Sequence, residues 1–102
     1  MTEQGLALIE ERLLKVVGEL EVQTAVASSY AAGMLPFADE MARIREFVDG
    51  GEYGLAYELE VATIETHPFV LSAAAAIALL ELGLLFGFKT DREKDAAFDK
   101  RT

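Results

Sequence analysis

Several residue types are absent or rare in this 102-residue chain, and each absence excludes a class of site. The chain has no cysteine, so disulfides and thiolate metal ligands are excluded. Its only histidine, His67, stands beside a proline, where we expect a loop or capping role, and a metal site or histidine-based triad lacks the remaining groups. The glycines at positions 50, 51 and 54 precede no Gly-Lys-Ser/Thr, so a phosphate loop is absent. We therefore expect no enzyme, no cofactor and no metal.

Basic residues are missing from the whole of residues 46–88, which hold seven acids and no Lys or Arg. The net charge of the chain is −9, and this segment contributes most of it. Nucleic acid is a poor partner for such a surface, because phosphates require a basic footprint. An acidic face would instead steer and orient a basic protein. The alternative is that the acids only keep an apolar chain soluble.

One long, mostly apolar run, residues 69–88, contains a single charged residue, Glu81. Its length would allow a membrane span, but Glu81 would be costly in lipid, and we expect no membrane association. Ser72 is a good N-cap, which predicts a helix over 73–86, apolar on all sides and central to the core. We expect Glu81 to reach a helix edge or to pair with an arginine such as Arg43 or Arg45. The core candidates are Leu71, Leu79, Leu82, Leu85 and Phe86.

The rest of the chain has apolar residues at the spacing typical of helices. Residues 3–20 carry apolar side chains at the spacing of one helix face, and the pattern weakens through residues 21–32 to a possible stop at Gly33. One long helix or two with a bend near Gly18 would both fit, and the combined length favours a bend or break. Residues 37–49 and 52–65 predict two helices joined at Gly50-Gly51, a short antiparallel pair.

These elements predict an all-α domain, a small bundle of four to five helices containing a central αα-hairpin. We expect one domain over residues 1–102, with a charged tail from about residue 89 that is partly frayed, although the capping-box pattern at 90–93 permits a short last helix. The N-terminus has no basic region before an apolar run, so a secretory signal is not expected, and we expect a cytoplasmic protein.

The helix predicted over 52–65 has two apolar faces that lie nearly opposite each other. Leu55, Leu59, Ala62 and Ala56 form the first face, which is expected to pack on the preceding helix. The second face consists of Tyr53, Tyr57, Val61 and Ile64. Either the helix is sandwiched between neighbours and buries both faces, or the tyrosines form an exposed platform rimmed by glutamates. Such a platform has the composition of a binding hot spot.

The segment Glu46-Phe47-Val48-Asp49-Gly50-Gly51-Glu52-Tyr53-Gly54-Leu55-Ala56-Tyr57-Glu58-Leu59 resembles the MafI-type immunity proteins of bacterial polymorphic toxin systems. Weaker similarity continues at Leu71-Ser72 and at Glu81-Leu82-Gly83 with Gly87, so the resemblance covers about residues 44–88. It implies a small protein that binds a cognate toxin domain and blocks its active site or substrate path. The acidic half favours a basic toxin, such as a nuclease.

On this hypothesis the glutamates steer the toxin and the tyrosines anchor it. The candidate partner-binding residues are Asp49, Glu52, Tyr53, Tyr57, Glu58, Glu60 and Glu65. The alternative function is a helical adaptor or homodimeric interaction module that uses the Tyr53, Tyr57, Val61 and Ile64 face on a second copy of itself.

Overall fold

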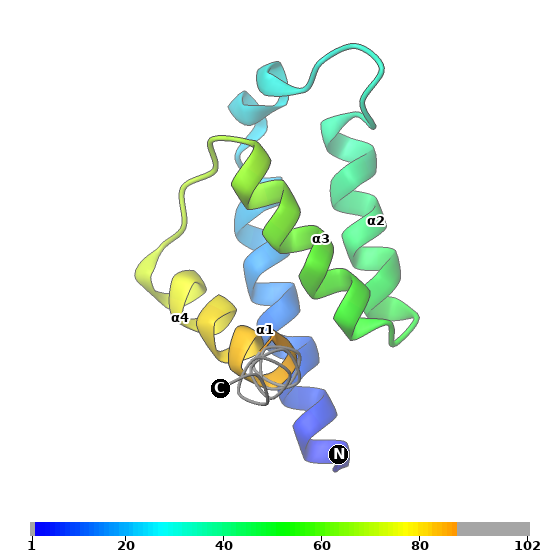
Figure 1. Cartoon of the computed structure of the whole chain (residues 1–102), viewed down its shortest axis with the longest axis vertical. Helices are drawn as coiled ribbons and strands as arrows, with labels where there is room; N and C mark the ends of the chain where they lie inside the picture. The colour runs from blue at the N-terminus through cyan, green and yellow to red at the C-terminus, as the bar shows by residue number, and fades with distance from the viewer. Residues whose placement is uncertain (1, 88–102) are drawn as a thin grey trace, which may run out of the picture.

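The computed structural model describes residues 2–87 and has an all-α fold, drawn in Figure 1. This confirms the predicted small helical bundle, including the hairpin, which is formed by α2 and α3. The expected tail and short last helix lie outside the described residues. In chain order the elements are α1 (Glu3–Glu21), the 3₁₀ helix η1 (Thr24–Ser29), α2 (Phe37–Asp49), α3 (Tyr53–Thr66), α4 (Ala73–Leu82) and the π-helical segment η2 (Gly83–Gly87).

The first helix, α1, is the central element, because α2, α3 and α4 all pack against it. Thr2 caps its start by accepting a hydrogen bond from the Gly5 backbone N–H at 3.0 Å. Apolar side chains recur every three or four residues, so they lie on one face of the helix. That face is completely buried and consists of Ile9, Leu13, Val16, Val17 and Leu20.

The break after α1 falls at Val22 and Gln23, and the helix passes through Gly18. The side chain of Gln23 explains the position of the break. Its Nε2 donates to the backbone oxygens of Glu19, at 3.0 Å, and of Val70, at 2.7 Å, while its Oε1 accepts from the Val70 N–H at 2.9 Å. One amide thus satisfies a free carbonyl at the helix end and fastens the segment before α4. One long helix is therefore not observed, and the expected break occurs at Val22 and Gln23 and not near Gly18, with a short 3₁₀ helix in place of the expected continuation.

The hairpin begins with α2, whose observed bounds match the prediction, and which buries Met41, Ile44 and Val48. The chain reverses at Gly51, whose φ of +75° is open to glycine without strain. The Glu52 N–H donates to the Phe47 carbonyl at 2.8 Å, which closes the turn. A second fastening links α2 to the end of α1, where Arg45 donates to both carboxylate oxygens of Glu21 at 2.8 and 2.5 Å.

The fourth helix, α4, starts as predicted at Ser72, whose Oγ accepts from the Ala75 N–H at 3.1 Å. Ser72 also binds α1, because its N–H donates to Glu19 at 2.9 Å and its Oγ donates to the other oxygen of the same carboxylate. These hydrogen bonds lower the pKa of Glu19. Because they favour the ionised carboxylate, the start of α4 is held to α1 most firmly above acidic pH.

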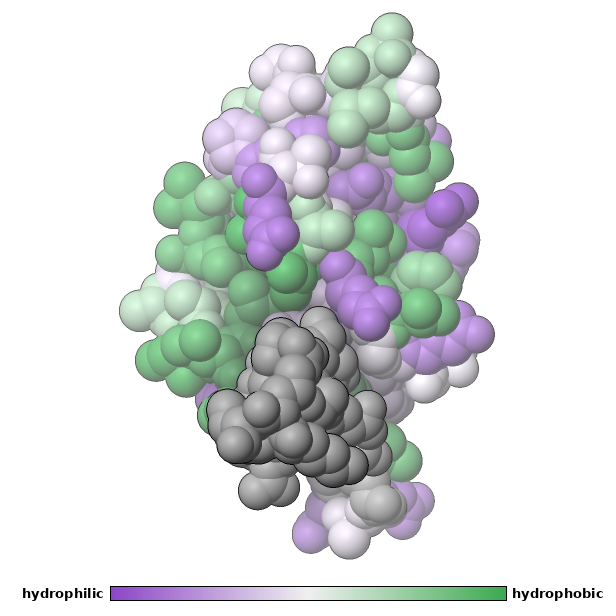
Figure 2. Space-filling model, in the orientation of Figure 1, coloured by the Kyte–Doolittle hydropathy of each residue, from purple (hydrophilic) through white to green (hydrophobic). Residues whose placement is uncertain are grey.

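The prediction that α4 is a central core helix is wrong. Its buried side is narrow, consisting of Ala75, Ala78 and Leu82, while Ile77 and Leu80 are 56% and 70% exposed. Figure 2 shows a hydrophobic area over the side of the molecule that α4 occupies. Hydropathy alone could not distinguish this arrangement, because it does not tell on how many sides a helix has neighbours. Among residues 2–87, no helix combines the length and the apolar character that crossing a bilayer requires.

The five expected core residues between positions 71 and 86 differ in their burial. Leu82 is buried, and Leu71, Leu79 and Phe86 are partly buried against the core. Leu85 is 42% exposed, so its assignment to the core is wrong. A π-helix turns through a smaller angle per residue than an α-helix. The residues of η2 therefore fall out of phase with α4, which turns Leu85 outward and leaves Phe86 inward.

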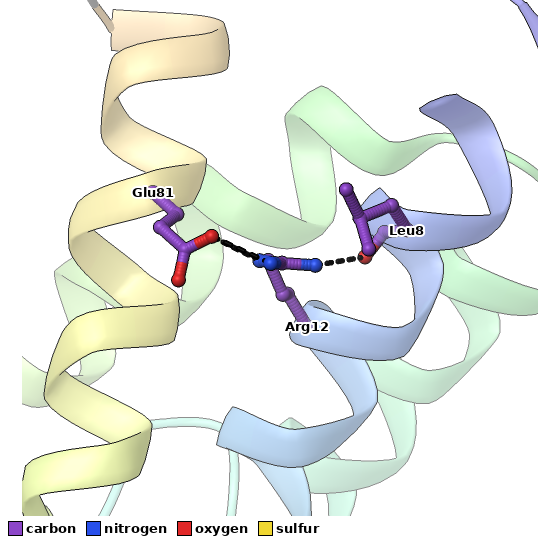
Figure 3. A network of polar contacts seen from close by, with 3 residues as sticks. All are labelled: Leu8, Arg12 and Glu81. Atoms are coloured by element: carbon purple, nitrogen blue, oxygen red, sulfur yellow. Dashed lines mark hydrogen bonds and ion pairs between the residues drawn. The ribbon is translucent and has the colours of Figure 1, made fainter. Parts of the chain in front are cut away.

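Glu81, the one charge in the apolar run, forms an ion pair with Arg12 of α1 (Figure 3). Its carboxylate oxygen lies 2.7 Å from Arg12 Nε and 2.6 Å from Nη2, and Arg12 Nη1 donates to the Leu8 carbonyl at 3.4 Å. The expectation of an arginine partner is met, but Arg43 and Arg45 are the wrong residues. Because Arg12 lies on α1, the pair joins the two helices and offsets the one charge that α4 carries.

Candidate functional site: the acidic face of the helical hairpin

The solvent-facing side of the hairpin carries five exposed acids that we call the hairpin surface: Glu46, Asp49, Glu52, Glu58 and Glu65. Glu46 lies on the side of α2 opposite the buried Ile44, and Glu58 and Glu65 lie on the side of α3 opposite Ala56, while Asp49 and Glu52 flank the turn. Arg43 is an exposed base nearby, whereas Arg45 is paired with Glu21. Figure 2 shows hydrophilic residues over the side formed by α2 and α3. The surface therefore has a negative field that Arg43 offsets only in part.

Four of the seven predicted site residues, Asp49, Glu52, Glu58 and Glu65, lie on the hairpin surface. All four are exposed to solvent, two beside the turn and two along the outer side of α3. The other three predicted residues, the two tyrosines and Glu60, do not share this surface.

The tyrosines point away from the hairpin surface and pack inside the molecule. The Tyr53 hydroxyl donates to Glu10 of α1 at 3.1 Å, and this hydrogen bond raises the pKa of Tyr53. The Tyr57 ring lies against Phe86 of η2, with 5.7 Å between ring centroids. Both tyrosines are half-buried. The open tyrosine platform is not observed, and the predicted burial of both apolar faces is wrong for the first face, because Leu55 and Ala62 are exposed.

Glu60 is the clearest correction, because its side chain is fully buried. Neither carboxyl oxygen has a hydrogen-bond partner among the described residues. Burial without compensation disfavours the charged form and raises the pKa of Glu60 from 4.5 to about 9. At neutral pH the group is therefore protonated, adds nothing to the negative surface and cannot touch a partner. Its predicted place on an exposed rim is wrong.

The spacing of Ala56, Glu60 and Thr63 contains the signal that would have placed Glu60 correctly. These residues are four and three positions apart, so they form one stripe along α3, and all three are buried. The two apolar faces predicted for this helix flank that stripe, although Leu55 is 49% exposed and Ala62 is exposed. Because the middle residue of this stripe, Glu60, is of a charged type, the sequence pattern did not reveal that the stripe is the buried face of α3.

A polar cluster that sequence patterns did not indicate joins α2, α3 and the end of η1. Glu40 Oε1 accepts hydrogen bonds from the Tyr30 hydroxyl at 2.8 Å and from the Thr63 hydroxyl at 2.6 Å. The His67 ring stacks on Tyr30 with 3.7 Å between centroids, and its Nδ1 lies 2.6 Å from Ser29 Oγ. Burial and the bond to Glu40 raise the pKa of Tyr30. The cluster ties together segments far apart in sequence.

His67 has the predicted capping role, since its N–H donates to the Thr63 carbonyl at 3.0 Å at the end of α3. The contact with Ser29 would be the first step toward a nucleophile–base pair. A triad also needs a group that orients the histidine. Within residues 2–87 no carboxylate is hydrogen-bonded to His67. The arrangement therefore accounts for a structural tether and gives no support to nucleophilic catalysis.

The same part of the chain contains no group of three or more His, Cys, Asp or Glu side chains arranged to hold a metal ion. Comparison of the chain with protein-family models, with curated proteins and with solved structures finds no match. The site is thus defined by its own geometry, which consists of an exposed acidic surface on a hairpin braced from behind by α1.

Proposed function

We propose that this chain is an immunity protein that binds a cognate bacterial toxin domain in the cytoplasm and blocks its active site or substrate path. The observation that carries the proposal is the exposed hairpin surface, where five acids lie within a segment without Lys or Arg. The partner that fits this surface is basic. A nuclease is the example that the charge favours, because a protein that binds phosphates presents basic residues.

The resemblance to MafI-type immunity proteins supports the same proposal, because its most specific segment, residues 46–59, forms the hairpin turn and its flanks. Glycines 50 and 51 shape the turn, while Asp49, Glu52 and Glu58 are exposed around it. Surface charges of this kind chiefly raise the rate of association and orient the partner. Tight binding would require additional contacts between exposed groups. Tyr53 and Tyr57 are half-buried, so only the exposed part of each side chain is available to a partner.

The proposal is tested by the open reading frame immediately upstream in the genome of origin. If that frame encodes a large toxin, expression of its C-terminal domain should arrest growth of a bacterial host. Co-expression of this chain should restore growth, and the two proteins should co-purify as a complex. The paired substitutions Glu58→Gln and Glu65→Gln should weaken protection, whereas Glu3→Gln and Glu11→Gln, which remove the same charge from α1, should leave it intact. Growth arrest that this chain does not relieve would contradict the proposal.

A second candidate, a homodimeric interaction module, is favoured by the exposed apolar face of α4. Val70, Ile77, Leu80 and Leu84 are each more than half exposed, and Glu81 beside them is neutralised by Arg12. This face replaces the Tyr53 and Tyr57 face that the sequence suggested for self-association. Sedimentation equilibrium of the purified chain separates the candidates. A dimer that Leu80→Glu dissociates supports the module, and a monomer at micromolar concentration excludes it.

A further inference from the structure

A small cleft opens between α2 and α3 at the end of the hairpin that is farther from its turn. It has a volume of about 110 Å³. The carboxylate in its wall belongs to Glu40 of α2, and the rest of the wall is formed by Met34, Leu59, Ala62, Thr63, Thr66 and His67. The cleft therefore combines one acid with apolar and hydroxyl-bearing side chains.

Glu40 is held in a fixed position but retains unused acceptor capacity. The hydroxyls of Tyr30 and Thr63 both donate to Oε1, from different elements, so the carboxylate is fixed by two tethers. Its Oε2 has no donor among the described residues. An ionised carboxylate offers about four acceptor sites. A cation entering the cleft could therefore bind Oε2 without breaking either existing hydrogen bond.

The rim of the cleft continues into the hairpin surface. Ala62 lies four residues after Glu58 and three residues before Glu65, and residues at these spacings are neighbours on a helix. Both glutamates are exposed. The cleft thus adjoins the acids proposed to steer a basic partner, while Leu59 and Ala62 provide apolar wall for an aliphatic stem. Arg43, one turn after Glu40 on α2, is exposed and forms no ion pair among the described residues, so it is a competing cation from the same chain.

We propose that this cleft receives an arginine side chain of the basic partner, with the guanidinium on Glu40 Oε2 and the aliphatic stem against Leu59 and Ala62. Arginine suits the site better than lysine, because its planar guanidinium can bind the Glu40 carboxylate while another N–H reaches the rim acids. The inference rests on the proposed function and adds to it a specific contact for the partner. The hairpin surface attracts the partner, and the cleft fixes its register.

The test is a titration of the ¹⁵N-labelled full chain with N-acetyl-arginine methylamide, followed by NMR. The neutral isostere N-acetyl-citrulline methylamide is titrated in parallel. We expect saturable shifts centred on Thr63, Thr66 and His67, with about tenfold weaker binding of the citrulline compound, because a charge-assisted hydrogen bond is lost. Equal binding of the two compounds, or shifts spread evenly over all exposed acids, would overturn the proposal.

Three substitutions make the test specific. Glu40→Gln keeps an oxygen that can accept from Tyr30 and Thr63, so the fold should persist while the preference for arginine disappears. Glu11→Gln removes the same charge from an exposed position on α1, outside the cleft and the hairpin surface, and should bind as the unaltered chain does. Arg43→Gln should strengthen binding, because a competing cation is removed. If Glu40→Gln retains the full preference, the cleft is not the site.

These experiments distinguish failure of the cleft proposal from failure of the proposed immunity function. Toxin binding that depends on Glu58 and Glu65 but is unchanged in Glu40→Gln would refute the cleft and leave the immunity proposal standing. Selective arginine binding in the cleft by a chain that fails to bind the toxin would refute the immunity proposal and retain the cation site.

Discussion

Replacing Glu60 with leucine should stabilise this protein, and the gain should increase with pH. The Glu60 side chain is fully buried, and neither oxygen has a partner among the described residues. A buried polar group without a hydrogen bond costs roughly 1–3 kcal/mol, even when it is neutral. Leucine fills similar space between Ala56 and Thr63 without that cost.

The pH dependence follows from the pKa of Glu60, which burial raises from 4.5 to about 9. Between these values the folded chain binds one more proton at this site than the unfolded chain does. The free energy of unfolding therefore falls as pH rises, by about 1.4 kcal/mol per pH unit. This loss is absent at acidic pH, is about 3 kcal/mol at neutral pH, and approaches about 6 kcal/mol once the folded form ionises.

The assay is urea unfolding, followed by circular dichroism, of the unaltered chain and Glu60→Leu at acidic, neutral and alkaline pH. The difference in unfolding free energy should widen steadily with pH, and at neutral pH the melting temperature of the leucine variant should be higher by on the order of 10 °C. Glu58→Leu, an exposed neighbour, is the control and should show no comparable trend. A difference independent of pH, or a leucine variant less stable than the unaltered chain at neutral pH, would refute this account of Glu60.

Two further predictions concern the contacts that seat α4 and η2. A Cβ at Gly83 would lie 3.0 Å from the Tyr57 hydroxyl oxygen. The change in unfolding free energy caused by Gly83→Ala should therefore be more favourable in a Tyr57→Phe background, with a coupling of about 1 kcal/mol in a double-mutant cycle. Additive effects of the two substitutions would show that this crowding is absent. Ser72→Ala removes an N-cap and should cost about 1 kcal/mol in urea unfolding at neutral pH. Because the bonds from Ser72 lower the pKa of Glu19, their stabilisation is present above the unfolded pKa and is lost as pH falls through the folded pKa, so the cost should shrink in acid. A cost that stays constant across that range would contradict the contribution of Glu19.

Apolar spacing and glycine position were sufficient to predict α1, α2 and the hairpin. These features are local, because the period of a helix and the conformational freedom of Gly51 are properties of the segment itself. The start of α4 followed in the same way from Ser72, whose side chain caps its own helix. The outward position of Asp49, Glu52, Glu58 and Glu65 was also predictable, because acids are rarely buried.

Sequence patterns did not predict the burial or contacts of residues whose surroundings depend on which elements pack together. Glu60 breaks the rule for acids, and only the packing of α3 on α1 and α2 shows that its stripe faces inward. Hydropathy could not predict that α4 would lie at the edge of the bundle with Leu80 exposed. The Glu40 cluster needs Tyr30 and Thr63 to approach from different elements. The residue spacing within a single segment contains no information about such contacts between elements.

The most direct test of the proposed function is the salt dependence of the association rate between this chain and the proposed toxin domain, taken from the open reading frame immediately upstream. If the hairpin surface steers a basic partner, the association rate constant should fall steeply as salt is raised. The slope should become shallower in the Glu58→Gln, Glu65→Gln variant, while the Glu3→Gln, Glu11→Gln variant should keep the slope of the unaltered chain. The same slope in all three proteins, or no association at low salt, would contradict the claim that the acidic face of the hairpin is the binding site.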